Sequence, residues 1–121
     1  MTLNRKILVA DDEESYRTIL GSELQRAGYT IVLASDGEEA IRALSKEKID
    51  LALLDIKMPK TDGLAVLKYI REKCPDTKVI ILTGFADLRI AMEAKENGAI
   101  DFVSKPFSLD DILATIRQSL T

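Results

Sequence analysis

Short apolar runs alternate with longer amphipathic segments along the whole chain. The runs are rich in Val, Ile and Leu and nearly continuous in apolarity, and they span Lys6–Ala10, Thr30–Ala34, Asp50–Leu54, Lys78–Leu82 and Ile100–Val103. Continuous apolarity is typical of strands that are buried on both faces, as in a parallel sheet covered by helices. Since Val and Ile also favour strands, the pattern predicts five parallel strands.

The segments between the runs carry signals for the beginning and end of helices. Asp36–Glu39 and Ser108–Asp111 each place an N-cap residue and an acidic third position ahead of an apolar stripe. Asp62 is interpreted as a further helix cap. Gly28 and Gly98 stand where left-handed C-caps are expected. Helices are therefore predicted between all the strands.

Five strands that alternate with helices predict an α/β fold, a (βα)5 three-layer sandwich. Crossovers between parallel strands are right-handed and place helices on both faces of the sheet. The strand order 2-1-3-4-5 is one common solution, in which ligands bind beyond the carboxyl ends of the strands, between strands 1 and 3. No linker or low-complexity tract interrupts residues 1–121, so we expect a single domain.

The amino-acid composition indicates the cellular compartment in which the protein is expected to work. Of the 121 residues, 46% are hydrophobic and 31% are charged, as in a soluble globular protein. No apolar run approaches the roughly 20 residues that span a bilayer, and the N-terminus has no signal-peptide pattern. The single cysteine, Cys74, cannot form an internal disulfide, which fits a reducing compartment. We therefore expect a cytoplasmic protein with no membrane partner.

Charge and the lack of histidine exclude several classes of function. The formal net charge is −3 and Lys and Arg do not cluster, so direct nucleic-acid binding by this domain is not expected. The sequence contains no histidine. Catalytic triads of the Ser-His-Asp kind and zinc sites with His ligands are therefore excluded within the chain.

Polar side chains stand at or near the carboxyl ends of four of the predicted strands. They are the pair Asp11-Asp12, then Asp55, Thr83 and Lys105. Carboxyl ends of parallel strands meet at one edge of a sheet, so these side chains are expected to form one pocket. Clustered carboxylates suit a hard cation, Mg²⁺ or alternatively Mn²⁺, rather than zinc. A carboxylate is also a competent nucleophile toward phosphorus, and phosphoryl transfer needs the neutralisation of charge that a cation and a lysine supply.

Each of these residues has an ordinary structural explanation when it is taken alone. Asp12 could cap the first helix, and a Thr at a strand end usually serves a turn. Lys105 before Pro106 would be a solvated charge. Only their joint occurrence at adjoining strand ends favours a functional site.

The residues at these strand ends resemble the receiver domain of two-component response regulators, over about Arg5 to Leu120. The resemblance rests on the segments Ile7–Glu14 (ILVADDEE), Leu54–Pro59 (LDIKMP) followed by Asp62-Gly63, Leu82–Gly84 (LTG) and Lys105–Phe107 (KPF). It implies the flavodoxin-like, CheY-like version of the (βα)5 fold. It also implies a signalling phosphoacceptor that promotes only its own phosphorylation and dephosphorylation, not an enzyme with a separate substrate.

The resemblance assigns roles to individual residues. It implies that Asp55 accepts a phosphoryl group from a histidine of a sensor histidine kinase or a histidine phosphotransfer protein. Asp12 and Asp55 would bind Mg²⁺ directly, Asp11 largely through a water, and the Lys57 carbonyl would complete the set. Lys105 would pair with the phosphoryl oxygens, and its bond to Pro106 would be cis.

The same resemblance implies a conformational output. Thr83 and Phe102 would be a switch pair, in which Thr83 moves toward the phosphoryl group and the Phe102 ring turns inward. The readout surface would be the fourth helix, fifth strand and fifth helix, with exposed candidates at Arg89, Glu93, Lys95 and Glu96. The signal would pass to an output domain or a partner protein that regulates transcription. Phosphorylation would also allow the domain to form a homodimer.

Two positions are expected to set the lifetime of the phosphorylated form. Lys57 stands two residues after Asp55, and Phe85 stands two residues after Thr83. Both would flank the path of the hydrolytic water, and their bulk would slow self-dephosphorylation. The stretches Leu82–Gly84 and Asp101–Phe107 further resemble the receivers of NtrC-type ATPase transcription activators.

Other functions fit these residues less well. A Mg²⁺-dependent phosphatase of the haloacid dehalogenase type would need a second Asp two residues after Asp55, where this chain has Lys57. A nucleotide-binding module would cradle phosphates in a Gly-rich loop, whereas the first loop here reads Asp-Asp-Glu-Glu. A degenerate receiver that acts as a constitutive interaction module remains the main alternative, against which the intact Asp55, Thr83 and Lys105 argue.

Overall fold

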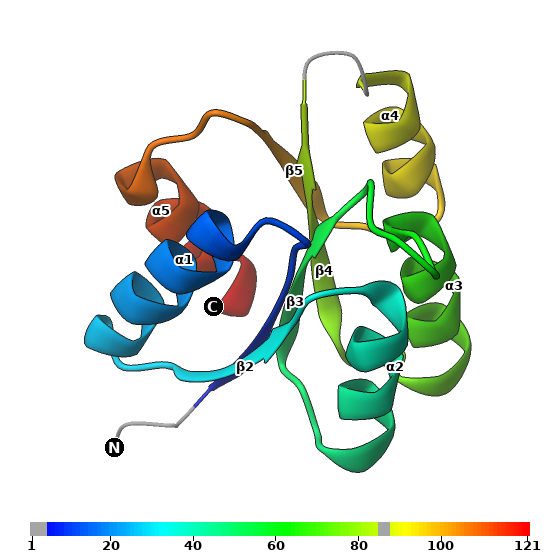
Figure 1. Cartoon of the computed structure of the whole chain (residues 1–121), viewed down its shortest axis with the longest axis horizontal. Helices are drawn as coiled ribbons and strands as arrows, with labels where there is room; N and C mark the ends of the chain where they lie inside the picture. Colours follow the sequence, from blue (N-terminus) through cyan, green and yellow to red (C-terminus); the bar gives the residue numbers. More distant parts are fainter. Residues whose placement is uncertain (1–4, 85–87) are drawn as a thin grey trace.

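A computed structural model describes residues 5–84 and 88–121 of the chain. Within these residues, five strands form one sheet between two layers of helices (Figure 1). The strands are β1 (Lys6–Ala10), β2 (Thr30–Ala34), β3 (Leu51–Asp55), β4 (Lys78–Thr83) and β5 (Asp101–Ser104), and the helices are α1 (Glu14–Arg26), α2 (Gly37–Lys46), α3 (Gly63–Lys73), α4 (Leu88–Glu96) and α5 (Leu109–Leu120).

The sheet is parallel and has the order β2-β1-β3-β4-β5. Helices α1 and α5 cover one face, while α2, α3 and α4 cover the other (Figure 1). The predicted three-layer (βα)5 architecture and its strand order are confirmed. The order reverses between β1 and β3, and at such a point the diverging crossovers leave space beyond the strand ends.

The two faces of the sheet bury two separate clusters of apolar side chains. Leu8 and Leu54 pack with Leu67 of α3 in the cluster on the α2, α3 and α4 side. On the other side, Ile7 and Leu53 pack with residues of α1 and α5. All five residues of β3 are buried, as the continuous apolarity of its sequence predicts. Because neighbouring strand residues point to opposite faces, each inner strand contributes to both clusters.

Helices α2, α3 and α5 begin at the predicted caps. The Asp36 carboxylate accepts a hydrogen bond from the backbone N–H of Glu39 at 2.8 Å, and Asp62 accepts one from Ala65 at 2.9 Å. Ser108 caps α5 in the same way. Gly28 and Gly98 adopt φ angles of 105° and 108°, the left-handed region that a C-cap glycine tolerates without strain.

The observed strand ends differ from the predicted ones by one residue. Asp55 and Thr83 are the last residues of β3 and β4 rather than the first residues beyond them, and β5 begins and ends one residue later than predicted. Ladder hydrogen bonds join backbone groups, so they extend through polar residues as readily as through apolar ones; Lys105 N–H, for example, still donates to the Thr83 carbonyl at 2.7 Å. The suggestion that Asp12 caps α1 is also wrong, because Glu13 is the N-cap residue and has no side-chain cap.

Candidate functional site

Acidic side chains gather at the carboxyl ends of β1 and β3. Asp11 and Asp12 follow β1 directly, and Asp55 is the last residue of β3. Carboxylate oxygens of Asp11, Asp12 and Asp55 all lie within 4.8 Å of one another. Asp11 and Asp55 are buried, whereas Asp12 is exposed. The predicted convergence of these three residues is present in the fold.

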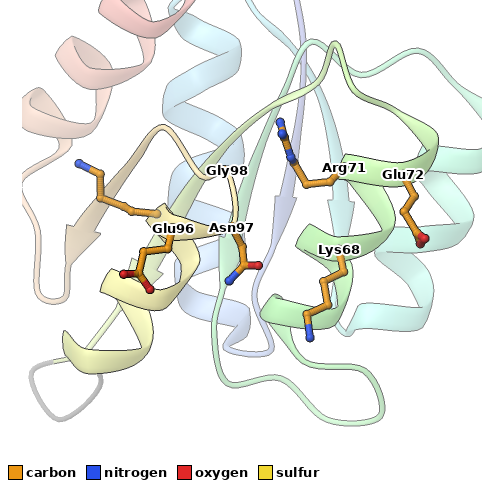
Figure 2. Close-up of a pocket in the computed structure, with 7 residues that line it drawn as sticks. Lys68, Arg71, Glu72, Glu96, Asn97 and Gly98 are labelled. Carbon is orange, nitrogen blue, oxygen red and sulfur yellow. The ribbon is translucent and has the colours of Figure 1, made fainter.

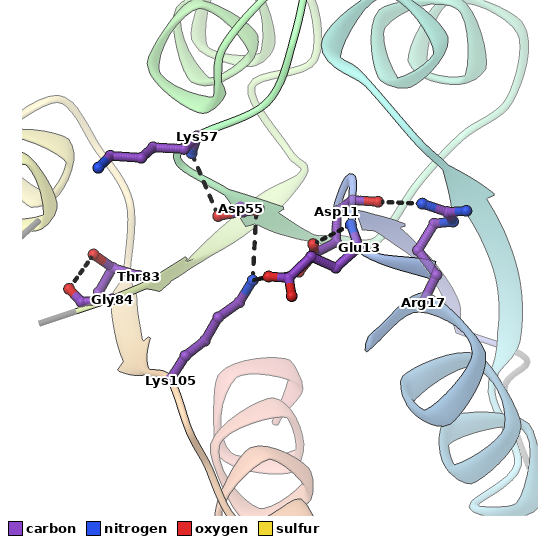
Figure 3. A network of polar contacts seen from close by, with 8 residues as sticks. All are labelled: Asp11, Glu13, Arg17, Asp55, Lys57, Thr83, Gly84 and Lys105. Carbon is purple, nitrogen blue, oxygen red and sulfur yellow. Dashed lines mark hydrogen bonds and ion pairs between the residues drawn. The ribbon is translucent and has the colours of Figure 1, made fainter. Parts of the chain in front are cut away.

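The ammonium group of Lys105 reaches the same place from the loop after β5 (Figure 3). Its Nζ lies 2.8 Å from Asp11 Oδ2, 3.3 Å from Glu13 Oε1 and 3.5 Å from Asp55 Oδ2. Burial by itself would lower the pKa of Lys105, but the contact with Asp11 and the charge of Asp55 outweigh it, and the pKa lies above its ordinary value. Lys105 therefore stays charged over the physiological range. The peptide bond between Lys105 and Pro106 is cis, as expected.

Asp11 is held in place by its own backbone neighbours. Its Oδ1 accepts a hydrogen bond from the Glu13 N–H at 2.9 Å, and its carbonyl accepts one from the Arg17 guanidinium at 2.8 Å (Figure 3). Asp11 Oδ2 is buried, and its charged partner among the described residues is the Lys105 ammonium at 2.8 Å. A carboxylate oxygen has more than one lone pair, so Oδ2 can also contact a water or a cation in the pocket.

Asp55 is the residue whose acidity the site changes most. Burial, together with the negative charge of Asp11, raises the pKa of Asp55 to about 7, against the opposing effects of Lys105 and of the Lys57 N–H. That N–H donates to Asp55 Oδ1 at 3.3 Å. Lys105 alone therefore does not balance the negative charge, and the carboxylates are short of cationic partners.

The donor set fits a hard divalent cation. Three carboxylates offer only oxygen ligands within 4.8 Å of one another, and burial together with the charge of Asp11 raises the pKa of Asp55. Mg²⁺ prefers oxygen ligands and keeps several waters, and it needs only one or two protein carboxylates. Asp11, Asp12 and Asp55 are therefore suitable ligands for Mg²⁺.

An open pocket lies beside the acidic cluster. Its volume is about 350 Å³, and it is lined by Asp12, Glu13, Asp55, Lys57, Gly84 and Lys105. A larger groove of about 610 Å³ lies between α3 and the end of α4 (Figure 2), lined by Lys68, Arg71, Glu72, Lys95, Glu96, Asn97 and Gly98. The groove carries exposed charges of both signs. The smaller pocket holds the buried charges and is the candidate site.

Thr83 lies on β4, the neighbour of β3, and Phe102 lies on β5, the next strand out. The Thr83 side chain is buried, and its hydroxyl donates to the Gly84 carbonyl at 3.1 Å (Figure 3). The Phe102 ring is half-buried against the cluster on the α2, α3 and α4 side. Lys57 and Phe85 are the two residues expected to set the lifetime of the phosphorylated form. Lys57 lines the pocket, whereas Phe85 lies outside the described residues.

The proposed readout residues are on the surface, as predicted. Arg89, Glu93, Lys95 and Glu96 of α4 are all exposed. Leu88 and Met92 of the same helix are exposed as well, at 50% and 59%, and they were not among the predicted readout residues. Their i, i+4 spacing was the available signal, because it places two apolar side chains on one helix face.

Two further residues near Lys105 were also missed: Glu13, the N-cap residue of α1, and Tyr16 within that helix. Glu13 forms an ion pair with Lys105, and the Lys105 ammonium lies 4.2 Å from the centroid of the Tyr16 ring. Glu13 and Lys105 are separated by 92 positions in the sequence. No local pattern brings such residues together, so the docking of α1 on the sheet had to be known first.

Comparison with known proteins gives the same family over nearly the whole chain. Residues 7–117 match the family described as response regulator receiver domain. The chain is 41% identical to the alkaline phosphatase synthesis transcriptional regulatory protein PhoP of Bacillus subtilis and 38% identical to the DNA-binding transcriptional regulator NtrC of Escherichia coli, covering 98% and 95% of this chain. It spans 49% and 24% of those two relatives, that is, half of their length or less.

Solved structures agree with these sequence relatives. A response regulator receiver domain protein from Clostridium thermocellum superposes with a TM-score of 0.91 at 34% identity, covering 96% of this chain and 94% of that one. NtrC among the relatives supports the resemblance to NtrC-type regulators. None of the helices in residues 5–84 and 88–121 is long and apolar enough to cross a membrane. The chain belongs to the receiver domains of two-component response regulators, which are phosphoacceptor signalling domains.

Proposed function

We propose that Asp55 is the phosphoacceptor of this receiver and that Asp11, Asp12, Asp55 and the Lys57 carbonyl hold Mg²⁺, or alternatively Mn²⁺. The observation that supports this most directly is the meeting of three carboxylates and one buried ammonium at the edge of a pocket. Bound Mg²⁺ would supply positive charge beside the incoming phosphoryl oxygens. The phosphodonor is a histidine of a sensor kinase or of a histidine phosphotransfer protein. A partner must supply this histidine, because this chain contains no histidine.

The transfer is a displacement at phosphorus. A carboxylate oxygen of Asp55, in the ionised form, attacks the phosphorus, and the bond from phosphorus to the donor's imidazole nitrogen breaks with its electron pair going to nitrogen. Lys105 lies 3.5 Å from Asp55 Oδ2, which is close enough for its ammonium to turn toward the phosphoryl oxygens. The domain thus promotes only its own phosphorylation and the later hydrolysis of the aspartyl phosphate.

The new group changes the balance of charges in the pocket. A phosphoryl group adds a charge of about −2 near neutral pH and three acceptor oxygens. In our proposal the Thr83 hydroxyl leaves the Gly84 carbonyl and donates to one of these oxygens, and the Phe102 ring turns inward. The domain would then have two conformations, one with and one without these movements. A modification can shift the equilibrium between them only through contacts that differ between the two conformations. The hydroxyl supplies such a contact.

The output of the proposed switch is the surface of α4, β5 and α5. The exposed charges of α4, Arg89, Glu93, Lys95 and Glu96, lie on this surface. Since PhoP and NtrC are transcriptional regulators at least twice as long as the matched region, we propose that residues 1–121 form one domain that controls transcription. It would act in the cytoplasm through an output domain or a partner protein. The phosphorylated domain would also bind a second copy of itself to form a homodimer.

Intact mass after incubation with acetyl phosphate tests the assignment. We expect a gain of one phosphoryl group in the presence of Mg²⁺, none in excess chelator and none in Asp55→Asn. Asp62→Asn is the matched control, because Asp62 is a helix cap outside the acidic cluster and Asn also caps helices well. A protein that binds no Mg²⁺ and gains no mass would instead be a degenerate receiver that acts as a constitutive interaction module.

A further inference from the structure

The ammonium group of Lys105 is enclosed by more than carboxylates. Its Nζ lies 4.2 Å from the centroid of the Tyr16 ring, well within the roughly 6 Å over which a cation is attracted to an aromatic face. The Lys105 side chain is only 12% exposed. The ring therefore forms one wall around the ammonium, and the carboxylates of Asp11, Glu13 and Asp55 form the others.

Tyr16 is itself fixed by a second aromatic ring. Its centroid lies 5.3 Å from that of Phe107, with the two planes tilted by 45°, a favourable arrangement for aromatic pairs. Phe107 follows Lys105 by two residues, on the loop between β5 and α5. The ring pair thus joins the first turns of α1 to the loop that carries Lys105.

The ring differs from Asp11 and Asp55 in what phosphorylation does to it. Transfer to Asp55 turns that carboxylate into an acyl phosphate, and Asp11 has a competing role beside the proposed cation. A neutral aromatic face neither binds Mg²⁺ strongly nor changes its charge when Asp55 is modified. The ring is therefore, with the exposed carboxylate of Glu13, a partner of Lys105 that is the same before and after transfer.

We propose that Tyr16 is a positioning residue, whose ring holds the Lys105 ammonium at the side of the pocket where the phosphoryl oxygens arrive. The proposal rests on the proposed function of Asp55 and adds a determinant of its rate. The ammonium already contacts the carboxylates of Asp11 and Asp55, and without the ring it would lose one of its walls and move over a wider range of positions. It would then contact the incoming group less often.

The test compares Tyr16→Leu with Tyr16→Phe, using acetyl phosphate and Mg²⁺. Leucine removes the aromatic face, and we expect phosphorylation to slow by about 3- to 10-fold, the range that an exposed to partly buried cation–aromatic contact supports. Phenylalanine keeps the face and should restore a rate within about twofold of the wild type. Tyr16→Leu should lower the maximal rate of phosphorylation and leave the half-saturating concentration of acetyl phosphate unchanged.

Tyr29→Leu is the matched control for stability. Tyr29 packs against the apolar cluster on the α1 and α5 side, as Phe107 does, but it directly precedes β2, at the amino ends of the strands and away from the acidic cluster. Its substitution should lower the unfolding temperature without slowing phosphorylation. Equal rates in Tyr16→Leu and wild type, or equal slowing in Tyr16→Leu and Tyr16→Phe, would overturn the proposal.

A spectroscopic signature separates positioning from packing. The chain has three tyrosines and no tryptophan, so Tyr29→Phe with Tyr69→Phe leaves Tyr16 as the sole strong fluorophore. Adding beryllofluoride with Mg²⁺ should change its emission, and the change should be lost in Lys105→Met; an identical change there would count against the proposal. If the wild type gains no phosphoryl group, both proposals fall, whereas normal phosphorylation of Tyr16→Leu removes this one alone.

Discussion

The carbonyl oxygen of Thr61 lies where a side chain on Gly37 would have to go. A Cβ at Gly37 would be 1.8 Å from that oxygen, so the first residue of α2 is in direct contact with the loop between β3 and α3. The same loop contains Lys57 and leads to the Asp62 cap of α3. The close approach therefore ties the start of α2 to one side of the candidate site.

Gly37→Ala is expected to destabilise the protein. The new methyl group must push a backbone carbonyl away, and such overpacking costs about 1–3 kcal/mol or somewhat more. Urea unfolding measures the change, and Mg²⁺ titration of the variant should show weaker binding because the Lys57 loop moves. In Gly21→Ala the new Cβ meets side-chain atoms of Leu33, at 3.3 Å, and of Ile31, at 3.9 Å, and no backbone carbonyl. A loss as large as that of Gly37→Ala would therefore contradict the explanation.

The stability of the metal-free protein should fall as the pH rises from about 4 to about 7. The pKa of Asp55 is raised from 3.8 to about 7 in the folded protein, so between these values the folded state binds more protons than the unfolded state. Stability then decreases with increasing pH. At about 1.36 kcal/mol per unit of pKa, the loss reaches at most about 4 kcal/mol.

Urea unfolding in excess chelator across this pH range checks the sign. Asp55→Asn cannot ionise at this position, so its stability should depend less on pH and exceed that of the wild type near pH 7. The two proteins should converge near pH 4, where the wild-type carboxyl is protonated in both states. A wild type that gains stability from about pH 4 to about pH 7 relative to Asp55→Asn would refute this account.

Mg²⁺ should restore the stability that is lost at neutral pH. A ligand that binds only the folded state at about 100 times its dissociation constant stabilises it by about 2.7 kcal/mol. We expect a rise in unfolding temperature with Mg²⁺ for the wild type and a much smaller rise for Asp12→Asn, which loses the exposed carboxylate of the cluster. Asp62→Asn should respond like the wild type.

Asp36→Ala should lower the stability of the protein through the start of α2. The carboxylate caps the Glu39 N–H at 2.8 Å, and loss of an N-cap costs about 0.5–2 kcal/mol. Asp36 Oδ2 also lies 3.6 Å from the exposed Lys60 ammonium, a pair of small value because water screens it. Asp36→Asn keeps the cap and removes the pair, so thermal unfolding of the two variants shows which contact matters.

Lys57→Ala should shorten the life of the phosphorylated form. Lys57 lines the pocket beside Asp55, and its removal would open a path for water to the phosphorus. The decay of the phosphorylated mass after removal of acetyl phosphate measures the lifetime. An unchanged decay would mean that the Lys57 side chain does not hinder the water.

The fold was predictable because one physical requirement repeats along the chain. Strands buried on both faces need continuous apolarity, and β1, in which four of the five residues are buried, has the predicted bounds for this reason. The bounds of β2 are also as predicted, although Ala34 is its only buried residue. The meeting of Asp11, Asp55 and Lys105 followed from parallel strand ends sharing an edge of the sheet. The contacts of Glu13 and Tyr16 with Lys105 did not follow, because they depend on how α1 docks and on side-chain directions that no periodicity encodes.

The burial of β3 has a mechanical consequence for signalling. This strand is buried along its whole length, whereas β5 at the edge of the sheet has three half-buried residues and one exposed residue. Closely packed interiors resist displacement, and weakly packed segments open more readily. Asp55 is thus attached to a strand with no exposed residue, and we expect strain that arises there to be relieved at the less closely packed edge strands, of which β5 is reached through Thr83 and β4.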